Sequence, residues 1–376
     1  MRRNLLALVT VGLLTVGGLT ACTDDDGKTG GGTGKVAARG GDGTGKVGVI
    51  LPDTTTSQRW GTDDPKLLKA AFDAADVPVE IENAQGDPAN FQRIGDRMIA
   101  EGATVLIIAN LDPASGTYVL NKARAAGVKT IDYDRLTLNG GADYYVSFDN
   151  VKVGQLQGQG LVRCLNATKA LRGDRPPRIV YLNGAPTDNN ATLFKNGYDS
   201  VLQPKYDDGT YLKGPDQSVD KWDNKEGRSI FIEMLNQFNN DVDGVLAAND
   251  GLGNAAISVL RERKKNGTVP VTGQDAETQG LQNILAGDQC MTVYKPIRQE
   301  ADAAAKLAIG LFKGQQTKVR GQVKDPQSGA YVPAVLLEPI PIFKEDVSKV
   351  IKDGFVAKKA VCAGRFAALC TQNGIN

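Results

Sequence analysis

The chain has 376 residues, more than one hydrophobic core usually serves, so its length favours two domains. Its 44 basic and 43 acidic residues nearly cancel and form no basic cluster, which argues against nucleic acid as a partner. Histidine is absent, which removes the commonest general base and the commonest zinc ligand. The lack of histidine argues against a zinc site. We expect neither a metal nor a cofactor.

Residues 1–21 have the pattern of a secretion signal: two arginines precede LLALVTVGLLTVGGL, an apolar run too short for a dependable membrane span. The run ends in LTAC, which resembles a bacterial lipobox, so Cys22 is expected to carry acyl chains. An ordinary signal peptide with a chance cysteine is the alternative. Residues 22–45 are glycine-rich and are expected to form a flexible linker. These features predict an extracytoplasmic protein, lipid-anchored to the outer face of the bacterial cell membrane, with no other membrane contact.

From Lys46 onward, short β-branched runs alternate with amphipathic stretches. Apolar strands separated by helices are typical of a parallel sheet covered on both faces. The alternation begins again after Asp149, which predicts two units of this kind. The expected strands include KVGVIL (46–51), PVEIEN (78–83), TVLIIAN (104–110), VKTIDYD (128–134), RIVYLNG (178–184), GVLAAND (244–250), VPVTGQD (269–275) and CMTVYKP (290–296).

The predicted fold is α/β, with two doubly wound parallel-sheet lobes joined by a hinge that the chain crosses more than once. The segments after residue 296 are too few for a third domain, so they are expected to complete the first two sheets. We assign residues 46–147 and 296–330 to the first lobe, 148–295 and 331–361 to the second, and 362–376 to a tail.

Four cysteines follow the predicted lipidation site: Cys164, Cys290, Cys362 and Cys370. An even number in an exported chain permits disulfides in three pairings, between which the sequence does not choose. Cys362 and Cys370 lie close together and are the favoured pair. No C-x-x-C motif is present.

Polar residues cluster where predicted strands end. Asp134 and Arg135 follow one strand, Asp188 to Asn190 a second, Asn249 and Asp250 a third, and Asp275 a fourth. In open α/β sheets, ligands bind at these strand ends, so the clusters predict one ligand gripped from several sides. Helix capping is the alternative for single members, notably Asp250 and Asn189.

Eight motifs spread over residues 46–355 give the chain a recognisable resemblance. They are QRW (58–60), YDR (133–135), SFDNVKVGQLQ (147–157), DNNATLFKNG (188–197), AND (248–250), GQDAE (273–277), MTVYKP (291–296) and IKDGF (351–355). In this order they resemble the periplasmic sugar-binding proteins of ABC importers, which have the type I periplasmic binding protein fold. Within that family the similarity is greatest to the receptors for D-xylose.

The resemblance implies a sugar site and assigns its residues. Hydrogen bonds to sugar hydroxyls are implied for Arg59, Arg135, Asn190, Asn249, Asp275 and Lys295. Trp60 and Trp222 would stack on the ring faces, with a core role as the alternative for each. Asp134 and Asp188 would lie in or beside the site. The implied site has balanced charge, because three cations (Arg59, Arg135 and Lys295) face three carboxylates (Asp134, Asp188 and Asp275). This balance suits a neutral sugar better than a sugar acid or phosphate.

The implied function is a monomeric binding protein, not an enzyme, that closes two lobes around a monosaccharide and delivers it to an ABC permease. D-xylose is the first candidate, with glucose or another aldose as alternatives. A sugar receptor that acts in chemotaxis or with a sensor kinase would have the same sequence features, so it is a further alternative. Gly251, Gly253 and Ala256 also have the spacing of a dinucleotide-binding turn. This turn comes late in the second lobe rather than in the first βαβ unit, which disfavours an NAD-dependent dehydrogenase.

Overall fold

The structure is a computed structural model that describes residues 42–315 and 317–375. The predicted signal peptide, Cys22 and most of the glycine-rich segment lie outside these residues. Among the described helices, none is long and apolar enough to cross a membrane.

The first lobe is built on a seven-stranded sheet in the order β10-β11-β5-β4-β3-β1-β2. All its neighbouring strands are parallel except β10, which pairs antiparallel with β11. Its elements are β1 (Lys46–Leu51), α1 (Arg59–Thr62), α2 (Asp64–Ala74), β2 (Val79–Asn83), α3 (Pro88–Ala100), β3 (Ala103–Ile108), α4 (Pro113–Ala125), β4 (Lys129–Tyr133), β5 (Tyr144–Phe148), α11 (Ile297–Phe312), β10 (Gly321–Lys324) and β11 (Tyr331–Leu337).

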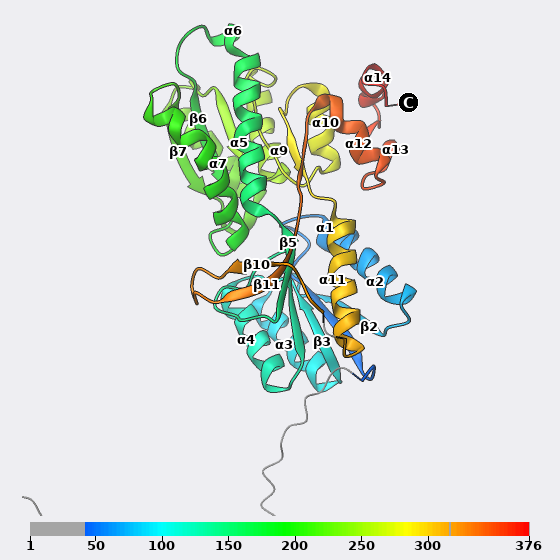
Figure 1. Cartoon of the computed structure of the whole chain (residues 1–376). Helices are drawn as coiled ribbons and strands as arrows, with labels where there is room; N and C mark the ends of the chain where they lie inside the picture. The colour runs from blue at the N-terminus through cyan, green and yellow to red at the C-terminus, as the bar shows by residue number, and fades with distance from the viewer. Residues whose placement is uncertain (1–41, 316, 376) are drawn as a thin grey trace, which may run out of the picture. The chain divides into compact units, whose positions relative to one another are not determined.

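Alternate residues of the first sheet face two separate cores, as the period of two along a strand requires. Val47, Val49 and Leu51 of β1 pack under α2 and α11, which lie side by side in Figure 1. Ile50 of β1 points the other way, toward α3 and α4. The strands are therefore buried on both faces, which explains their continuous apolar sequence.

The second lobe centres on β6, with β7 and β8 parallel on either side of it. Single parallel bridges at Val271 and Gln274 connect β8 to β9, and β9 pairs antiparallel with β12. Its elements are α5 (Asn150–Ala167), α6 (Lys169–Arg172), β6 (Arg178–Asn183), α7 (Asn189–Asp207), β7 (Leu212–Ser218), η1 (Asp220–Trp222), α8 (Asn224–Gln237), β8 (Gly244–Ala247), α9 (Asp250–Glu262), α10 (Thr278–Ala286), β9 (Thr292–Tyr294), β12 (Ile340–Ile342), η2 (Lys344–Asp346), α12 (Val347–Lys352), α13 (Lys358–Val361) and α14 (Phe366–Gln372).

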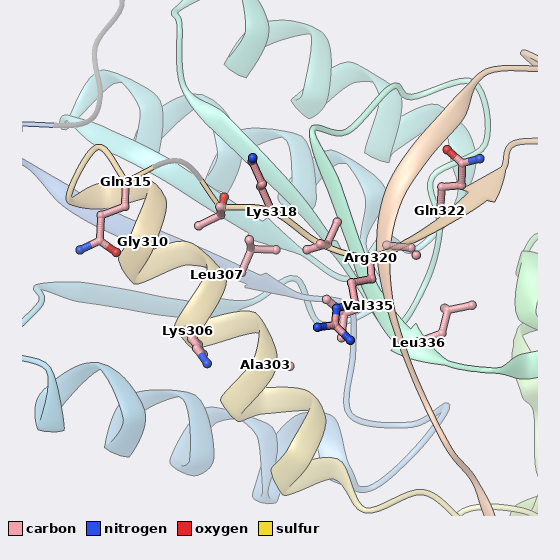
Figure 2. Close-up of a pocket in the computed structure, with 14 residues that line it drawn as sticks. Ala303, Lys306, Leu307, Gly310, Gln315, Lys318, Arg320, Gln322, Val335 and Leu336 are labelled. Atoms are coloured by element: carbon pink, nitrogen blue, oxygen red, sulfur yellow. The ribbon is translucent and has the colours of Figure 1, made fainter.

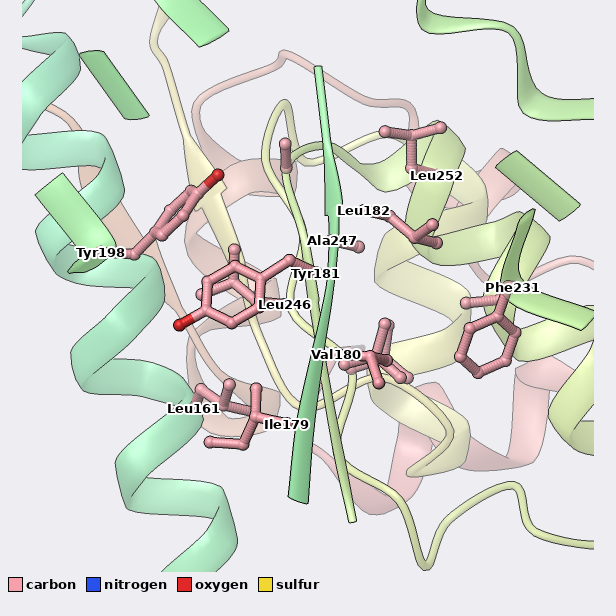
Figure 3. Packing of buried hydrophobic residues seen from close by; sticks show 14 of the residues in the cluster. Leu161, Ile179, Val180, Tyr181, Leu182, Tyr198, Phe231, Leu246, Ala247 and Leu252 are labelled. Atoms are coloured by element: carbon pink, nitrogen blue, oxygen red, sulfur yellow. The ribbon is translucent and has the colours of Figure 1, made fainter. Parts of the chain in front are cut away.

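The core of the second lobe repeats this two-faced arrangement. Figure 3 shows Tyr181 of β6 beside Tyr198 of α7, while Val180 on the opposite face lies toward Phe231 of α8. All four side chains are fully buried. The predicted α/β fold with two doubly wound lobes is therefore confirmed.

The chain passes between the two sheets three times: between β5 and α5, between β9 and α11, and between β11 and β12. The third passage corrects the sequence-based division. We assigned residues 331–361 to the second lobe, but Tyr331–Leu337 pairs with β5 in the first sheet. The antiparallel hairpin with β10 turns β11 back onto the sheet edge, so the crossing comes after Leu337.

Two disulfides fasten the second lobe. Cys164 at the end of α5 joins Cys290 before β9, and Cys362 joins Cys370 across the last two helices. The helices α13 and α14 lie against α10 in Figure 1, with Cys370 buried in that contact. The predicted tail is thus part of the second lobe.

Candidate functional site

The ends of the strands in both lobes bring their polar residues to one cavity of about 30 Å³, which we call the central cavity. All ten residues assigned to a sugar site line it: Arg59, Trp60, Asp134, Arg135, Asp188, Asn190, Trp222, Asn249, Asp275 and Lys295. Thr56, Ser57, Phe194 and Gln274 complete the lining. Thr56 and Lys295, which are 239 positions apart in the sequence, meet here because parallel strands end at the same edge of a sheet.

Arg59 is held by two carboxylates behind the cavity that the sequence analysis missed. Its Nε and Nη2 donate to the two oxygens of Asp64 at 2.8 and 2.6 Å, and Nη2 also donates to Glu300 at 2.5 Å. The hydroxyl of Tyr133 donates to Asp64 at 2.6 Å. Burial raises the pKa of Glu300 to about 8, against the opposing effect of Arg59. This arrangement fixes the guanidinium at the wall of the cavity.

Asp134 is one of the residues through which the two lobes contact each other. Arg59 Nη1 donates to its Oδ2 at 3.1 Å, and Asn190 of the second lobe donates to its Oδ1 at 3.1 Å and to its carbonyl at 3.0 Å. Burial opposes its ionisation, but Lys295, Arg59 and Arg135 outweigh burial and lower the pKa of Asp134. The carboxylate therefore stays charged, and its backbone adopts a left-handed φ of 61°.

Lys295 follows β9 and lies between one carboxylate from each sheet. Its Nζ is 3.4 Å from Asp134 and 3.5 Å from Asp275. Burial works against the charge of Lys295, yet the two carboxylates raise its pKa. Asp275 has a φ of 98°, a conformation that turns its side chain out of the strand, and its N–H donates to Val293 of β9.

Asp188 and Trp222 form the opposite wall. Asp188 caps α7 by accepting from Asn190 N, and it also accepts from the indole Nε1 of Trp222 at 3.3 Å. An oxygen of the same carboxylate lies 3.2 Å from Arg135 Nε. Asp188 therefore both caps α7 and lines the central cavity. Trp222 packs on Gly184, where a Cβ would lie 2.1 Å from the ring.

Asn249 and Asp250 point in different directions, which corrects our interpretation of Asp250 as a site residue. Asn249 caps α9 through Leu252 N and lines the central cavity. Asp250 turns into the protein, where it accepts from Gln289 Nε2 and from Glu277 N. Burial, followed by the charge of Glu277, raises its pKa well above the usual value. Asp250 therefore organises the loop that carries Asp275.

The glycines of the dinucleotide-like turn have packing roles. A Cβ at Gly253 would lie 3.0 Å from the carbonyl of Thr272, so the start of α9 passes close to the neighbouring strand segment. A Cβ at Gly251 would lie 2.7 Å from Asn224. Close helix–strand packing accounts for the motif without a nucleotide.

Two buried polar atoms in the lining have no partner among the described residues: Trp60 Nε1, which is a donor, and Gln274 Oε1, which is an acceptor. A buried polar group without a partner costs about 1–3 kcal/mol, so the site favours a ligand that both donates and accepts hydrogen bonds.

Two larger cavities adjoin the central one. The outer cavity, about 280 Å³, shares Thr56, Arg135, Asp188 and Trp222 with it. The hinge-side cavity, about 160 Å³, shares Ser57, Arg59, Asp275 and Lys295 and extends to Ile297, where the chain crosses between lobes.

A further cavity of about 690 Å³ lies in the first lobe between α11 and the β10–β11 hairpin (Figure 2). Lys306, Lys318 and Arg320 surround it, and none of the predicted site residues does. Among the described residues, no group of histidine, cysteine or acidic side chains is placed to hold a metal ion.

Comparison with known proteins places this geometry in a family. Residues 47–316 match the periplasmic binding protein domain. The chain is 34% identical to the D-xylose-binding periplasmic protein of Haemophilus influenzae, over 84% of this chain and 92% of that protein. It is also 34% identical to the multiple sugar-binding periplasmic receptor of Rhizobium radiobacter, over 82% and 90% of the two chains.

A solved structure gives the same result for the fold. The carbohydrate transporter solute-binding protein of Chloroflexus aurantiacus, in complex with D-glucose, superposes with a TM-score of 0.75 at 32% identity, over 84% of this chain and 97% of that chain. These relatives are binding proteins, not enzymes. Fold and sequence identity agree, and the chain belongs to the periplasmic binding protein family with the type I fold.

Proposed function

We propose that the chain is an extracytoplasmic sugar-binding protein that holds a neutral monosaccharide between its lobes, with D-xylose as the first candidate. The observation that carries this proposal is the pair of unpartnered polar atoms in the central cavity, one donor and one acceptor. Sugar hydroxyls both donate and accept, so one ring can pair with Trp60 Nε1 and Gln274 Oε1 together. The relatives that are named for xylose and for several sugars support the same ligand class.

The charges of the site favour a neutral sugar. Arg59, Arg135 and Lys295 are already opposed by the carboxylates of Asp134, Asp188 and Asp275. Asp64 adds a further carboxylate behind Arg59. Because no surplus of cations remains, a sugar acid or sugar phosphate would be bound at an electrostatic cost.

Binding requires movement. The central cavity is smaller than a sugar ring and has room for only one or two water molecules. The contacts that close it join side chains of different lobes, such as Asn190 with Asp134 and Arg135 with Asp188. These contacts must separate to admit the ring, and the three chain crossings supply the hinge.

Calorimetry of the purified full chain against D-xylose, D-glucose, L-arabinose, D-ribose and D-galactose tests the proposal. We expect micromolar or tighter binding, with D-xylose the tightest ligand. The variant Asn190→Ala, which removes a cavity amide, should bind at least about tenfold more weakly. Absence of binding to every neutral monosaccharide would overturn the proposal.

We further propose that Cys22 carries the membrane anchor and that the sugar is passed to an ABC permease. Incorporation of labelled fatty acid by the wild-type chain, but not by Cys22→Ala, tests the anchor. Uptake of labelled D-xylose by cells that lack this chain tests delivery: the wild-type chain should restore uptake and Asn190→Ala should not. Full uptake without the chain would contradict a transport role.

A further inference from the structure

The outer cavity is large enough to matter for binding in its own right. Its volume of about 280 Å³ approaches the lower end of the range of about 300–1,000 Å³ found for small-molecule sites. It is lined from both lobes and shares residues with the central cavity. The hinge segment at Ile297 lines the hinge-side cavity and not the outer cavity. A ligand that extends beyond the central cavity therefore has a defined space to enter.

The indole of Trp222 is common to the two cavities. Its position is strongly constrained: Lys221 and Trp222 both have left-handed backbones, with φ of 50° and 56°. The ring is packed against Gly184, lies edge-on to Phe194 with centroids 6.5 Å apart, and donates to Asp188. A left-handed tryptophan is costly, so the fold maintains this aromatic wall against backbone strain.

The rest of the outer lining combines apolar, hydroxyl and charged groups, the charged ones being Asp53, Asp112, Asp220 and Lys221. Leu111 and Pro88 come from the first lobe, and Thr187 and Lys221 come from the second. Thr187 and Lys221 are solvent-exposed, so they retain freedom to adjust to a ligand. Neutral sugar rings are recognised by this mixture of an aromatic face, aliphatic surface and a few polar side chains.

Arg135 and Asp188 form a polar bridge between the cavities, since both line each of them and lie 3.2 Å apart. A glycosidic oxygen placed between two rings would lie at this junction. The guanidinium of Arg135 carries five N–H donors, so it can donate to such an oxygen while its Nε remains beside Asp188.

We propose that the outer cavity is a second sugar-ring subsite, so that the protein binds a neutral disaccharide or glycoside as well as a monosaccharide. One ring would occupy the central cavity and the second ring would pack beside Trp222 in the outer cavity. This inference rests on the proposed function of the central cavity.

The test is calorimetry of the full chain with D-xylose and with xylobiose, its β-1,4-linked disaccharide. We expect xylobiose to bind within about tenfold of D-xylose. The variant Thr187→Trp places a large ring in the outer cavity at an exposed position, and it should weaken xylobiose at least about tenfold while D-xylose changes less than about twofold. Thr210→Trp, also exposed and outside both linings, is the matched control and should leave both sugars unchanged.

The outcomes separate the two proposals. If the wild-type chain binds D-xylose but not xylobiose, the outer subsite is overturned and the central sugar site stands. If Thr187→Trp weakens both sugars equally, the outer cavity is only a passage to the central site, and the subsite is again overturned. If neither sugar nor any other neutral monosaccharide binds, the proposed function itself fails and the subsite fails with it.

Discussion

Lys295 lies between a carboxylate of each sheet, with its Nζ 3.4 Å from Asp134 and 3.5 Å from Asp275. All three side chains are buried, so this one ammonium group compensates acidic groups on both sides of the cleft. The lysine therefore ties the electrostatics of the site to the closure of the lobes.

Replacement of Lys295 by methionine should separate these effects from simple packing, because methionine keeps the length of the side chain and removes the charge. Two buried carboxylates would then lose their cation, and we expect the free energy of unfolding to fall by about 3 kcal/mol. Binding of D-xylose should weaken at least about tenfold. Chemical denaturation and calorimetry measure the two effects. Lys306→Met, on an exposed position of α11, is the control, and wild-type affinity in Lys295→Met would contradict the assignment.

A methyl group at Gly184 should disturb the site through Trp222. The added Cβ would lie 2.1 Å from the indole, so the ring must move out of its present position. We expect Gly184→Ala to weaken sugar binding at least about tenfold and to shift the tryptophan fluorescence. Gly244→Ala in β8 is the matched control, because its Cβ would meet neighbours only at 3.4 Å. Equal behaviour of the two variants would show that the Gly184–Trp222 contact is unimportant.

Glu300 should make stability depend on pH. Burial raises its pKa from 4.5 to about 8, so folding favours the protonated form. The stabilisation that protonated Glu300 gives to the folded state is fully present below pH 4.5 and is lost as the pH rises toward 8. Glu300→Gln stays neutral throughout, so its unfolding free energy should rise relative to wild type over this window, by about 1 kcal/mol per pH unit.

Denaturation at several pH values between 4.5 and 8 measures this difference. Glu233→Gln, on an exposed position of α8, is the control and should follow the wild-type profile. Parallel profiles for wild type and Glu300→Gln would rule out the predicted role.

The two disulfides should contribute unequally to stability. Cys164–Cys290 closes a loop of 126 residues, whereas Cys362–Cys370 closes one of 8. Loop entropy predicts losses of about 5 and about 2.5 kcal/mol on removal of the first and the second bond. Denaturant titration of the paired Cys→Ser variants tests the order. A larger loss from the short C-terminal loop would indicate that it has a role beyond chain entropy.

The sequence was most informative where strands end. A strand pattern followed by Asp134–Arg135, or by Asn249, already specifies which edge of a sheet receives the side chain. It was least informative inside helices. Glu300 lies in EADAAAKLAIGLF, where an acid between alanines is indistinguishable from a solvent-facing residue until α11 is placed against Arg59.

The assignment of residues 331–337 and the interpretation of Asp250 were wrong for the same physical reason. The local sequence pattern does not determine which distant residues a segment contacts. Tyr331–Leu337 has the pattern of a strand that either sheet can accept, and only its pairing with β5 decides. Asp250 and Asn249 are neighbours at the start of α9, and both residue types favour helix starts. Which of them faces the cavity depends on Gln289 and on the loop at Glu277, both distant from the motif.

The left-handed backbones of Asp134, Trp222 and Asp275 have a consequence for evolution and engineering. Each costs about 1 kcal/mol or more, and the cost is met when the chain folds, before any ligand arrives. Binding then orders few additional backbone dihedrals, which preserves affinity. Glycine at these positions would relieve the strain and remove the side chains that the site needs. The most thermostable form of this protein is therefore expected to be a poor receptor, and selection for binding alone keeps it short of its stability optimum.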